Sequence, residues 1–404
     1  MKRMLLLSLC LALAMAANAR DVTLRFTSPS SDQREEVVEL DAAALRQKMG
    51  TDGKTRLRVL NAFGQDVPCQ LTHDGKFLVY VSVRPGTTTS LTVKEGSPTA
   101  PVSAWVGGNY FPNRAEDIAW ENDRGAYRVY GPSLQRAGEK AYGIDVWTKC
   151  VPTPILEHRY LMDRFGFDYR NECKKIDGTQ HLADSVYRLA SFHLDHGDGL
   201  DAYAVGPSLG CGAPALVQDD RLLFPYCYRR YRILDNGPLR FTLELTFEPK
   251  AVGSDAGVTE HRVISLDRGS NFNRCELWYE GLTQPMPLAA GVVVHTADKQ
   301  SLTLTPHAVL YADPTDRPDK LGCRVYVGVL FPDTAVKTRL MASHEADDIA
   351  GNAVGIATYR PQSHFVYYFG SAWSSADVRT FAAWQLRAQE TLEAITRPLR
   401  CTME

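Results

Sequence analysis

The first hundred residues alternate between short apolar runs and polar turns, with the period of two that is typical of half-buried β-strands. Three runs stand out, VTLRFT, TRLRVL and FLVYVSV, and glycine-containing turns such as HDGK separate them. We therefore predict a small β-sandwich domain over residues 20–100. The stretch KEGSPTAPVSA, residues 94–104, is rich in proline, serine and glycine, which is the composition of a linker.

Strand patterns also dominate the rest of the chain, residues 101–404. In LRFTLELTF, residues 239–247, leucine and phenylalanine alternate with polar residues, so one face is buried and the other faces water or a second sheet. Further strand-like runs are SVYRLASFHL, HRVISL, AAGVVVHT, CRVYVGVLF and HFVYYFG. No regular alternation of strands with helices occurs, which favours antiparallel sheets stacked as a sandwich over a doubly wound fold.

One helix is predicted near the C-terminus. Ser374 and Asp377 have the spacing of a capping box, apolar residues then recur at helical intervals, and Pro398 ends the helix. The predicted fold class is therefore all-β, with a small N-terminal β-sandwich, a larger antiparallel sandwich body and a C-terminal helix.

The N-terminus has the pattern of a secretory signal peptide. A basic start, MKR, precedes an apolar stretch that ends at Met15, and Ala17 and Ala19 fit a cleavage site of small residues. We expect residues 1–19 to be removed and the mature protein to be periplasmic or secreted, without membrane insertion; a retained anchor is the alternative. Of nine cysteines, Cys10 lies in this leader, and the others lack zinc-binding spacing, which leaves disulfides and buried thiols equally open.

The charges of the chain are balanced, with 45 basic and 47 acidic residues among 404 and no basic run. Such a balance creates no long-range field for a polyanion, so nucleic acid is not an expected partner. The sequence lacks the motifs G-x-S-x-G and H-E-x-x-H and a phosphate-binding glycine loop, which argues against a serine hydrolase, a zincin or a nucleotide enzyme. We expect neither a cofactor nor a resident metal.

A first candidate site lies in two neighbouring stretches, WENDRGAYRVYGP and GIDVWTKC. In an extended strand Arg128 and Tyr130 point to one side and Tyr127 to the other, so a guanidinium and an aromatic ring line one surface. This combination suits a sugar, because arginine binds carboxylates or paired hydroxyls and aromatic rings stack on a pyranose. The alternative is that the charges lie on surface turns and the rings in the core. The candidate substrate-binding residues here are Arg128, Asp145, Lys149, Trp120 and Asp123.

The second candidate site is SFHLDHGDGLDAYAVGPSLGCG, residues 191–212, which gathers histidines, aspartates and glycines directly after an apolar run. If that run is a strand that continues to about Asp195, His193 and Asp195 share one face, and the glycines let the chain turn back toward it. A histidine beside carboxylates suits acid–base catalysis near neutral pH. The candidate catalytic residues are His193, His196, Asp198 and Asp201, and Tyr203 is a candidate substrate-binding residue.

Two alternatives apply to this second stretch. Its aspartates could bond only their own backbone, as they do in many loops. A calcium-like ion held by Asp195, Asp198 and Asp201 is the other option, although the bidentate glutamate of an EF-hand loop is missing.

A third candidate lies in RCELWYEGL, where Glu276 and Glu280 share one face of a probable strand. A pair of carboxylates can perform glycosidase chemistry. Charged residues on the wet face of a sheet are far commoner, and that is the competing interpretation of Glu276.

The blocks WENDRGAYRVYGP, GIDVWTK, DHGDGLDAYAVGPSLGCG and LDNGPLRFTLELTF resemble those of a family of exported bacterial proteins of unassigned function. That family is placed in the galactose-mutarotase-like superfamily and is often encoded among genes for degrading pectin and other uronate polysaccharides. The resemblance extends from about Ala104 to the terminal helix, and NAFGQDVPCQLTHDGK is similar to the β domain that often precedes it. It implies a β-supersandwich. Superfamily members include aldose epimerases, which use a histidine and a glutamate, and lyases that act on uronates.

The leading hypothesis is a carbohydrate-active protein that opens and recloses the ring of a uronic acid or a related mono- or oligosaccharide. A histidine of the second stretch donates a proton to the ring oxygen, and Asp198, Asp201 or Glu276 takes the anomeric proton. Arg128 and Lys149 hold the substrate carboxylate. The alternatives are a lyase or glycoside hydrolase on uronate oligosaccharides and a non-catalytic carbohydrate-binding protein.

Overall fold

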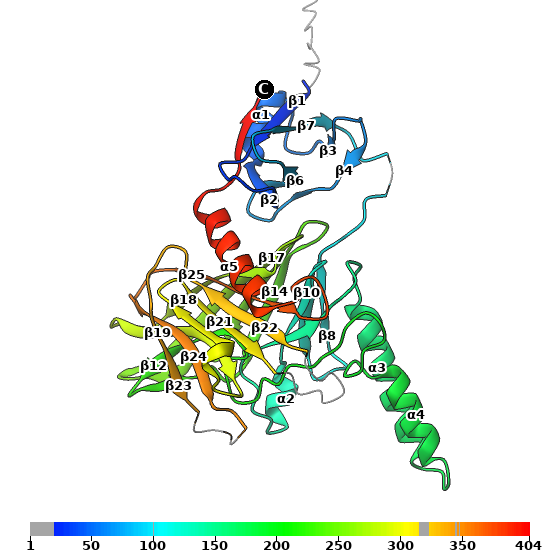
Figure 1. Ribbon diagram of the computed structural model, residues 1–404, viewed down its shortest axis with the longest axis vertical. Helices are drawn as coiled ribbons and strands as arrows, with labels where there is room; N and C mark the ends of the chain where they lie inside the picture. The colour runs from blue at the N-terminus through cyan, green and yellow to red at the C-terminus, as the bar shows by residue number, and fades with distance from the viewer. Residues whose placement is uncertain (1–19, 100, 315–322, 344–345, 347) are drawn as a thin grey trace, which may run out of the picture.

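The computed structural model describes residues 20–99, 101–314, 323–343, 346 and 348–404, so the expected signal peptide lies outside the described residues. The chain forms a small β domain and a larger β-sandwich body, and helix α5 (Phe381–Thr396) runs from the body toward the small domain (Figure 1). This arrangement confirms the predicted all-β class with a C-terminal helix.

The small domain contains a five-stranded and a three-stranded antiparallel sheet beside helix α1 (Ala42–Met49). The first sheet has the order β26 (Arg400–Met403), β1 (Val22–Thr27), β7 (Thr88–Glu95), β3 (Leu57–Leu60) and β4 (Asp66–Val67). The second has the order β2 (Arg34–Asp41), β6 (Lys76–Val83) and β5 (Cys69–Leu71). All three predicted strands of this region are present, as parts of β1, β3 and β6.

Strand β26 is a difference from the expected domain organisation. The last residues were expected in the body, but β26 pairs with β1, with Phe26 opposite Cys401. An edge strand exposes unpaired N–H and C=O groups, and the returning chain end covers one edge of this sheet. The small domain is therefore built from both ends of the described chain.

The body is a sandwich in which one large sheet faces two smaller ones. The large sheet contains β14 (Tyr228–Asn236), β15 (Arg240–Phe247), β17 (Asp255–Asp267), β18 (Phe272–Glu280), β25 (Phe365–Trp373), β22 (Val325–Leu330), β21 (Ala308–Asp313) and β20 (Leu302–Thr305), with β16 (Lys250–Val252) beside β17. The facing sheet contains β13 (Arg221–Leu223), β12 (Cys211–Gln218), β19 (Met286–Val294), β24 (Gly351–Tyr359) and β23 (Lys337–Ala342). The third sheet, called the site sheet below, contains β11 (Ile144–Thr148), β10 (Gly125–Val129), β9 (Asp117–Glu121) and β8 (Gly107–Phe111).

The alternating residues of β15 show how the main core forms. Phe241, Leu243 and Leu245 are fully buried between the layers, whereas Arg240 and Glu244 on the other face are only half-buried. The core continues across the layers to the facing sheet and the site sheet. The predicted alternation is therefore confirmed at these positions, although Thr242 on the other face is also buried.

The run SVYRLASFHL was wrongly predicted as a strand. Residues up to Ala190 belong to helix α4 (Gln180–Ala190), which packs beside helix α3 (Leu156–Cys173). Leu182, Val186 and Leu189 have helical spacing, a pattern that is visible only when the window begins before the apolar run. His193 therefore lies in a turn after a helix rather than at the end of a strand.

The terminal helix was correctly predicted, but it begins later than its proposed cap. Thr380 caps α5 by accepting a hydrogen bond from the N–H of Ala383 at 3.1 Å. Ser374 instead accepts from the N–H of Arg324. The described residues also form two short helical segments, α2 (Pro132–Arg136) and the 3-10 helix η1 (Lys299–Ser301).

Two further expectations concern membranes and cysteines. Among residues 20–404, as far as they are described, no helix is both long and apolar enough to cross a bilayer. The eight cysteines after the leader form no disulfide in this part of the chain, which favours the thiol alternative.

Candidate functional site

Arg128 lies at the centre of the site sheet, on the face that points away from the main core. Its neighbours Tyr127 and Val129 on β10 point into that core. Asp145 is directly opposite Arg128 on β11, and Ala119 is opposite it on β9. Because side chains alternate along a strand, Asp117, two residues before Ala119, shares the face of Arg128.

Three carboxylates surround the Arg128 guanidinium. Nη2 forms an ion pair with Asp145 and lies 3.1 Å from Oδ2 of Asp201, and Nη1 lies 3.6 Å from Oδ2 of Asp117. All four side chains are buried. Burial alone would lower the pKa of Arg128, but the surrounding carboxylates outweigh it and raise that pKa well above its usual value. Burial raises the pKa of Asp117, against the opposing effect of Arg128.

Aromatic rings enclose this charged cluster. The guanidinium carbon of Arg128 lies 4.8 Å from the ring centre of Tyr130, 5.1 Å from that of Trp147 and 5.8 Å from that of Phe192. Tyr160 of α3 stacks on Trp147 from outside, with ring centres 5.0 Å apart. The predicted placement of Arg128 and Tyr130 on one surface is therefore observed, but that surface is covered rather than open.

The glycine-rich turn brings Asp201 to Arg128. Gly199 has φ +110°, and a Cβ there would lie 2.1 Å from the carbonyl oxygen of Thr148, so this position requires glycine. Asp195 accepts hydrogen bonds from the N–H groups of Gly197 and Gly199 at 2.9 and 3.1 Å. The turn thus runs against β11, and Asp201 forms a β-bridge with Trp147.

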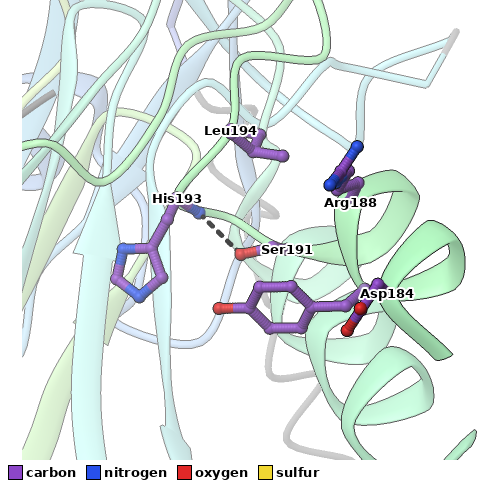
Figure 2. Close-up of a pocket in the computed structure, with 6 residues that line it drawn as sticks. Asp184, Arg188, Ser191, His193 and Leu194 are labelled. Atoms are coloured by element: carbon purple, nitrogen blue, oxygen red, sulfur yellow. Dashed lines mark hydrogen bonds between the residues drawn. The ribbon is translucent and has the colours of Figure 1, made fainter. Parts of the chain in front are cut away.

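His193 connects the buried cluster to the surface. Its Nδ1 lies 3.6 Å from Oδ2 of Asp201 and 3.4 Å from the Asp201 carbonyl oxygen, and its side chain is 42% exposed. Its backbone N–H donates to Oγ of Ser191 at 3.2 Å (Figure 2). Burial lowers the pKa of His193, and the positive charge of Arg128 lowers it further.

A pocket of about 250 Å³ lies at His193, between the turn and helix α4. Most of its walls are polar side chains that can bond hydroxyl or carboxylate groups (Figure 2). The lining residues are Asp184, Tyr187, Arg188, Ser191, His193 and Leu194. The three residues from α4 were missed by sequence reasoning, because that segment was interpreted as a strand.

Asp163 of α3 is another titratable group that sequence reasoning missed. Its carboxylate accepts a hydrogen bond from the backbone N–H of Phe192 and interacts electrostatically with Arg114 and His193. Burial raises the pKa of Asp163, and the interactions with Arg114 and His193 oppose this effect. No local pattern of the sequence places Asp163 beside the histidine turn, because the two segments meet only in the folded chain.

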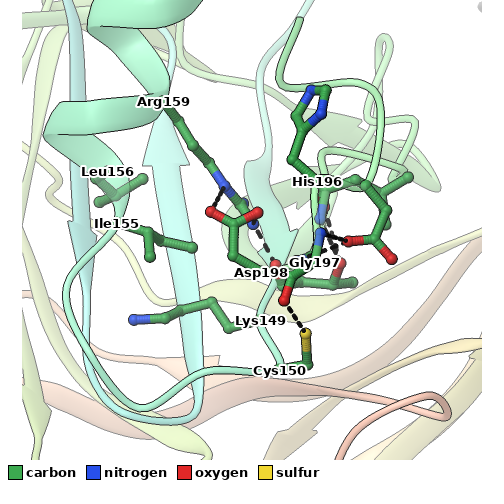
Figure 3. Close-up of polar contacts among 12 residues, drawn as sticks. Lys149, Cys150, Ile155, Leu156, Arg159, His196, Gly197 and Asp198 are labelled. Carbon is green, nitrogen blue, oxygen red and sulfur yellow. Dashed lines mark hydrogen bonds and ion pairs between the residues drawn. The ribbon is translucent and has the colours of Figure 1, made fainter. Parts of the chain in front are cut away.

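Lys149 was expected to hold a substrate carboxylate. Its side chain is instead buried and paired with other groups of the protein. Its ammonium lies 2.5 Å from Oε2 of Glu121 and donates to the carbonyl oxygens of Asn122 and Thr153. Glu121 also accepts from the N–H groups of Ile155 and Leu156 at the start of α3. This pair therefore anchors the helix, and Figure 3 shows Lys149 beside Ile155 and Leu156.

Asp198 and His196 lie in the same turn as His193, but neither lines the pocket. Asp198 pairs with the Arg159 guanidinium at 3.1 Å (Figure 3). Nε2 of His196 lies 2.9 Å from the Ser191 carbonyl oxygen. The carboxylates of the proposed calcium-like site thus bond to separate groups. Among the residues that the structure describes, no group of three or more metal-ligating side chains occurs.

The other candidate residues are distributed over the body. Trp120 lies in the main core and donates to Asn273 at 2.7 Å, and Asp123 accepts from the N–H of Gly269 at 2.7 Å. Glu276 is on the large sheet, where it bonds to His364 at 2.7 Å and to Arg274 at 2.8 Å.

Tyr203 is buried, and its ring meets His295 edge-on, with ring centres 6.4 Å apart. Nδ1 of His295 in turn lies 2.6 Å from Oδ2 of Asp313. His295 directly follows β19, and Asp313 is the last residue of β21, so the pair joins the ends of two strands.

The family comparison covers almost the whole described chain. The family model described as "Domain of unknown function (DUF4861)" matches residues 27–401. The chain belongs to this family. The match confirms the expectation of a family without an assigned function, and the placement in a mutarotase-like superfamily and the link to pectin stay predictions.

A curated relative of this DUF4861 chain is "Uncharacterized protein P7" from Formosa agariphila. It is 26% identical over 328 residues, which cover 77% of this chain and 73% of that protein. Its name states no activity.

Three of the solved structures that resemble the DUF4861 chain share 8% identity with it. They include an alpha-mannosidase from Enterococcus faecalis V583, with a TM-score of 0.43 over 95% of this chain, and a glycosyl hydrolase family 38 protein from the same species, with 0.46 over 96%. The galactosidase domain of alpha-galactosidase-sucrose kinase has 0.31 over 69%. This chain spans 43% to 48% of the length of these solved chains. None of these three TM-scores reaches 0.5, and nothing about the activity of this chain follows from them.

Proposed function

We propose that this protein acts on a single acidic sugar unit in the His193 pocket, by mutarotase-like proton transfer. The observation that carries the proposal is the dual contact of His193: its Nδ1 faces Asp201 of the buried Arg128 cluster, and its half-exposed ring lines a pocket that also contains Asp184, Tyr187 and Arg188. A rigid buried support behind an imidazole that faces a pocket is the arrangement that general acid–base catalysis requires. The pocket volume of about 250 Å³ suits one sugar ring better than a chain of several.

The contacts of the two ring nitrogens indicate that His193 acts as a base. Both groups near Nδ1 are acceptor oxygens of Asp201, which favours a proton on Nδ1 and leaves the lone pair of Nε2 for a bound molecule. Since the pKa of His193 is lowered, the imidazole is neutral at physiological pH. This reverses the sequence-based hypothesis, in which the histidine donated the proton.

The proposed reaction opens and recloses the sugar ring. Nε2 of His193 takes the proton of the anomeric hydroxyl as the bond between the anomeric carbon and the ring oxygen breaks, and the ring oxygen takes a proton from the Tyr187 hydroxyl. The open-chain aldehyde then recloses on its other face by the reverse transfers. Atoms and charges balance, and no external reagent is consumed.

Arg188 replaces Arg128 and Lys149 as the proposed partner of a substrate carboxylate. The latter two are buried in ion pairs, whereas Arg188 lines the pocket and is exposed. A guanidinium binds a carboxylate through two parallel hydrogen bonds. Asp184 and Ser191 supply bonding groups for hydroxyls. The pocket chemistry therefore supports a uronate or a related acidic sugar as the substrate class.

Anomer exchange measured by NMR tests the proposal. Freshly dissolved single anomers of galacturonate, glucuronate, galactose and glucose are followed with and without protein. We expect faster exchange for the uronates, a loss of about a hundredfold or more in His193→Gln, and a higher KM for uronates but not neutral sugars in Arg188→Gln. His181→Gln, an exposed histidine on the same helix and outside the pocket, is the matched control. Equal exchange with and without protein across the panel would refute the proposal.

A lyase acting at the end of a uronate oligosaccharide is the second candidate, and the presence of Arg188 and His193 in one pocket favours it. Arg188 would neutralise the carboxylate, and His193 would remove the adjacent proton while the glycosidic oxygen leaves. An unsaturated product that absorbs ultraviolet light distinguishes this reaction from ring opening. Sugar binding that is weakened by His193→Ala, without turnover in either assay, would instead indicate a carbohydrate-binding protein.

The signal-peptide pattern supports a further part of the proposal, that the protein works in the periplasm or outside the cell. Free uronates and uronate oligosaccharides would reach it there from polysaccharide degradation. Fractionation of cells that express the full chain, with immunodetection of the processed protein, tests this placement.

A further inference from the structure

Helices α3 and α4 form an antiparallel hairpin that projects from the body (Figure 1). Gly166 is at their closest approach, where a Cβ would lie 2.6 Å from the Cβ of Ala190. Farther along, the Arg170 guanidinium lies 4.8 Å from the ring centre of Tyr187. These contacts define which side of each helix faces the other.

One lateral face of this hairpin is apolar on both helices. Phe165 directly precedes the inward-facing Gly166, and Leu182 and Leu189 directly precede the buried Ala183 and Ala190. In two antiparallel helices, the residues that precede the inward positions lie on the same side of the pair, because the two helices wind in opposite senses when viewed along one axis.

Leu161 and Tyr169 lie one turn before and one turn after Phe165, on the same side of α3. The ring centres of Phe165 and Tyr169 are 6.2 Å apart. The apolar face thus contains five large residues, and all are exposed: Leu161 67%, Phe165 55%, Tyr169 39%, Leu182 44% and Leu189 72%.

We propose that this face is the interface of a symmetric dimer, in which the hairpins of two copies of this chain pack as a four-helix bundle. The exposed fractions amount to roughly 500 Å² of side-chain surface, if a large side chain presents roughly 150–250 Å². A standard interface buries about 800 Å² per partner, of which somewhat more than half is apolar. The available apolar area therefore matches what one stable dimer requires.

The charges of the hairpin favour a second copy over an anionic membrane surface. Acidic and basic residues are equal in number from residue 156 to residue 190, which gives no attraction to anionic lipid and no repulsion between copies. The acidic residues are Glu157, Asp163, Asp168, Glu172, Asp177 and Asp184, and the basic residues are Arg159, Arg164, Arg170, Lys174, Lys175 and Arg188.

The pocket is on the other side of the hairpin. Its α4 residues Asp184 and Arg188 directly follow Ala183 and Tyr187, which face α3, so they point away from the apolar face. Pairing of two hairpins therefore leaves the pocket accessible, and the dimer does not depend on the proposed function.

Two phenylalanines of α3 provide a matched test. Phe165 and Phe167 are both 55% exposed, but Phe167 follows Gly166 and lies on the opposite lateral side. Sedimentation velocity of the mature protein is measured from about 1 to about 100 µM, a range that brackets weak dimers. We expect a dimer for the wild type and for Phe167→Glu, and a monomer for Phe165→Glu. Circular dichroism confirms that both variants keep their helices.

A monomeric wild type over this whole range overturns the proposal, as does an equal effect of the two substitutions. If the wild type is monomeric and co-floats with vesicles of neutral phosphatidylcholine, the apolar face is a membrane contact and the dimer is excluded. Should Phe165→Glu lose its helical signal, Leu189→Gln on α4 replaces it, and a dimer that persists in this variant also contradicts the proposal.

Discussion

Oδ2 of Asp201 lies 3.6 Å from Nδ1 of His193, and the same oxygen lies 3.1 Å from Nη2 of Arg128. One carboxylate oxygen thus joins a half-exposed imidazole to a buried guanidinium. The guanidinium is itself held by Asp145 across the strand pair. The orientation of His193 is therefore fixed from inside the protein, while its other edge faces the pocket.

Replacing Asp201 by asparagine should weaken catalysis by His193 without changing the volume of the pocket. The loss of a negative charge beside the imidazole disfavours its protonated form, so the pKa of His193 should fall further. We expect kcat/KM for the preferred sugar to decrease about tenfold to hundredfold. The acidic limb of the pH–rate profile should move to lower pH. A decrease in activity with an unmoved limb would show that Asp201 acts only on stability.

Replacing Arg128 by methionine should strongly destabilise the protein. Asp145, Asp201 and Asp117 would stay buried without their common cation, which costs about 3–5 kcal/mol for a broken buried pair. Arg164→Met is the control, because Arg164 pairs with Asp168 on the exposed side of α3, and its loss should cost less than about 1 kcal/mol. Urea denaturation followed by tryptophan fluorescence measures both. Similar values for the two variants would mean that the cluster contributes little to folding.

Lys149 and Glu121 should behave as a structural pair in a double-mutant cycle. Lys149→Met leaves Glu121 with the two N–H donors at the start of α3, whereas Glu121→Leu leaves a buried ammonium with only carbonyl oxygens. We therefore expect Glu121→Leu to destabilise more, and the double variant to recover part of the loss, with a coupling energy of about 1–3 kcal/mol. Calorimetric titration with a uronate should show unchanged affinity in Lys149→Met. If the effects of Lys149→Met and Glu121→Leu on stability are additive and Lys149→Met also weakens sugar binding, Lys149 contacts the substrate, as the sequence predicted.

The sequence was informative where a local pattern determines the structure. Alternation in LRFTLELTF placed one buried face of β15 correctly, and alternation around Arg128 placed it beside Tyr130 and opposite to Tyr127. The sequence hypothesis combined residues of the first two candidate stretches in one site, and in the structure these stretches meet, since Asp201 contacts Arg128. In each case the alternation of side chains along an extended strand carried the information.

The features that sequence reasoning missed depend on contacts between distant segments. Helix α4 was interpreted as a strand because its apolar residues were read from a window that began after Leu182. For the same reason the pocket residues Asp184, Tyr187 and Arg188 were missed. Lys149 was assigned to the substrate because nothing in its local pattern reveals that Glu121 lies beneath it. Burial and ion pairing are tertiary properties, and a single sequence without an alignment does not encode them in its spacing.

The pH dependence of stability should identify His193 as a histidine that is kept neutral in the folded state. Its pKa is below the usual value of 6.5, so in the interval between the folded and the unfolded pKa the unfolded chain binds more protons at this residue. The free energy of unfolding therefore increases with pH across that interval. The contribution of His193 is complete above pH 6.5 and is lost as the pH falls through its folded pKa.

His193→Gln cannot be protonated and should lose this dependence. The difference in unfolding free energy between wild type and variant should shift in favour of the wild type from about pH 5 to about pH 7.5. His181→Gln, at an exposed position of helix α4, is the matched control. Denaturant melts at the two pH values measure it. A difference for His193→Gln that grows toward acid pH would mean that the Asp201 carboxylate outweighs burial and raises the pKa of the imidazole, in which case His193 would act as the proton donor.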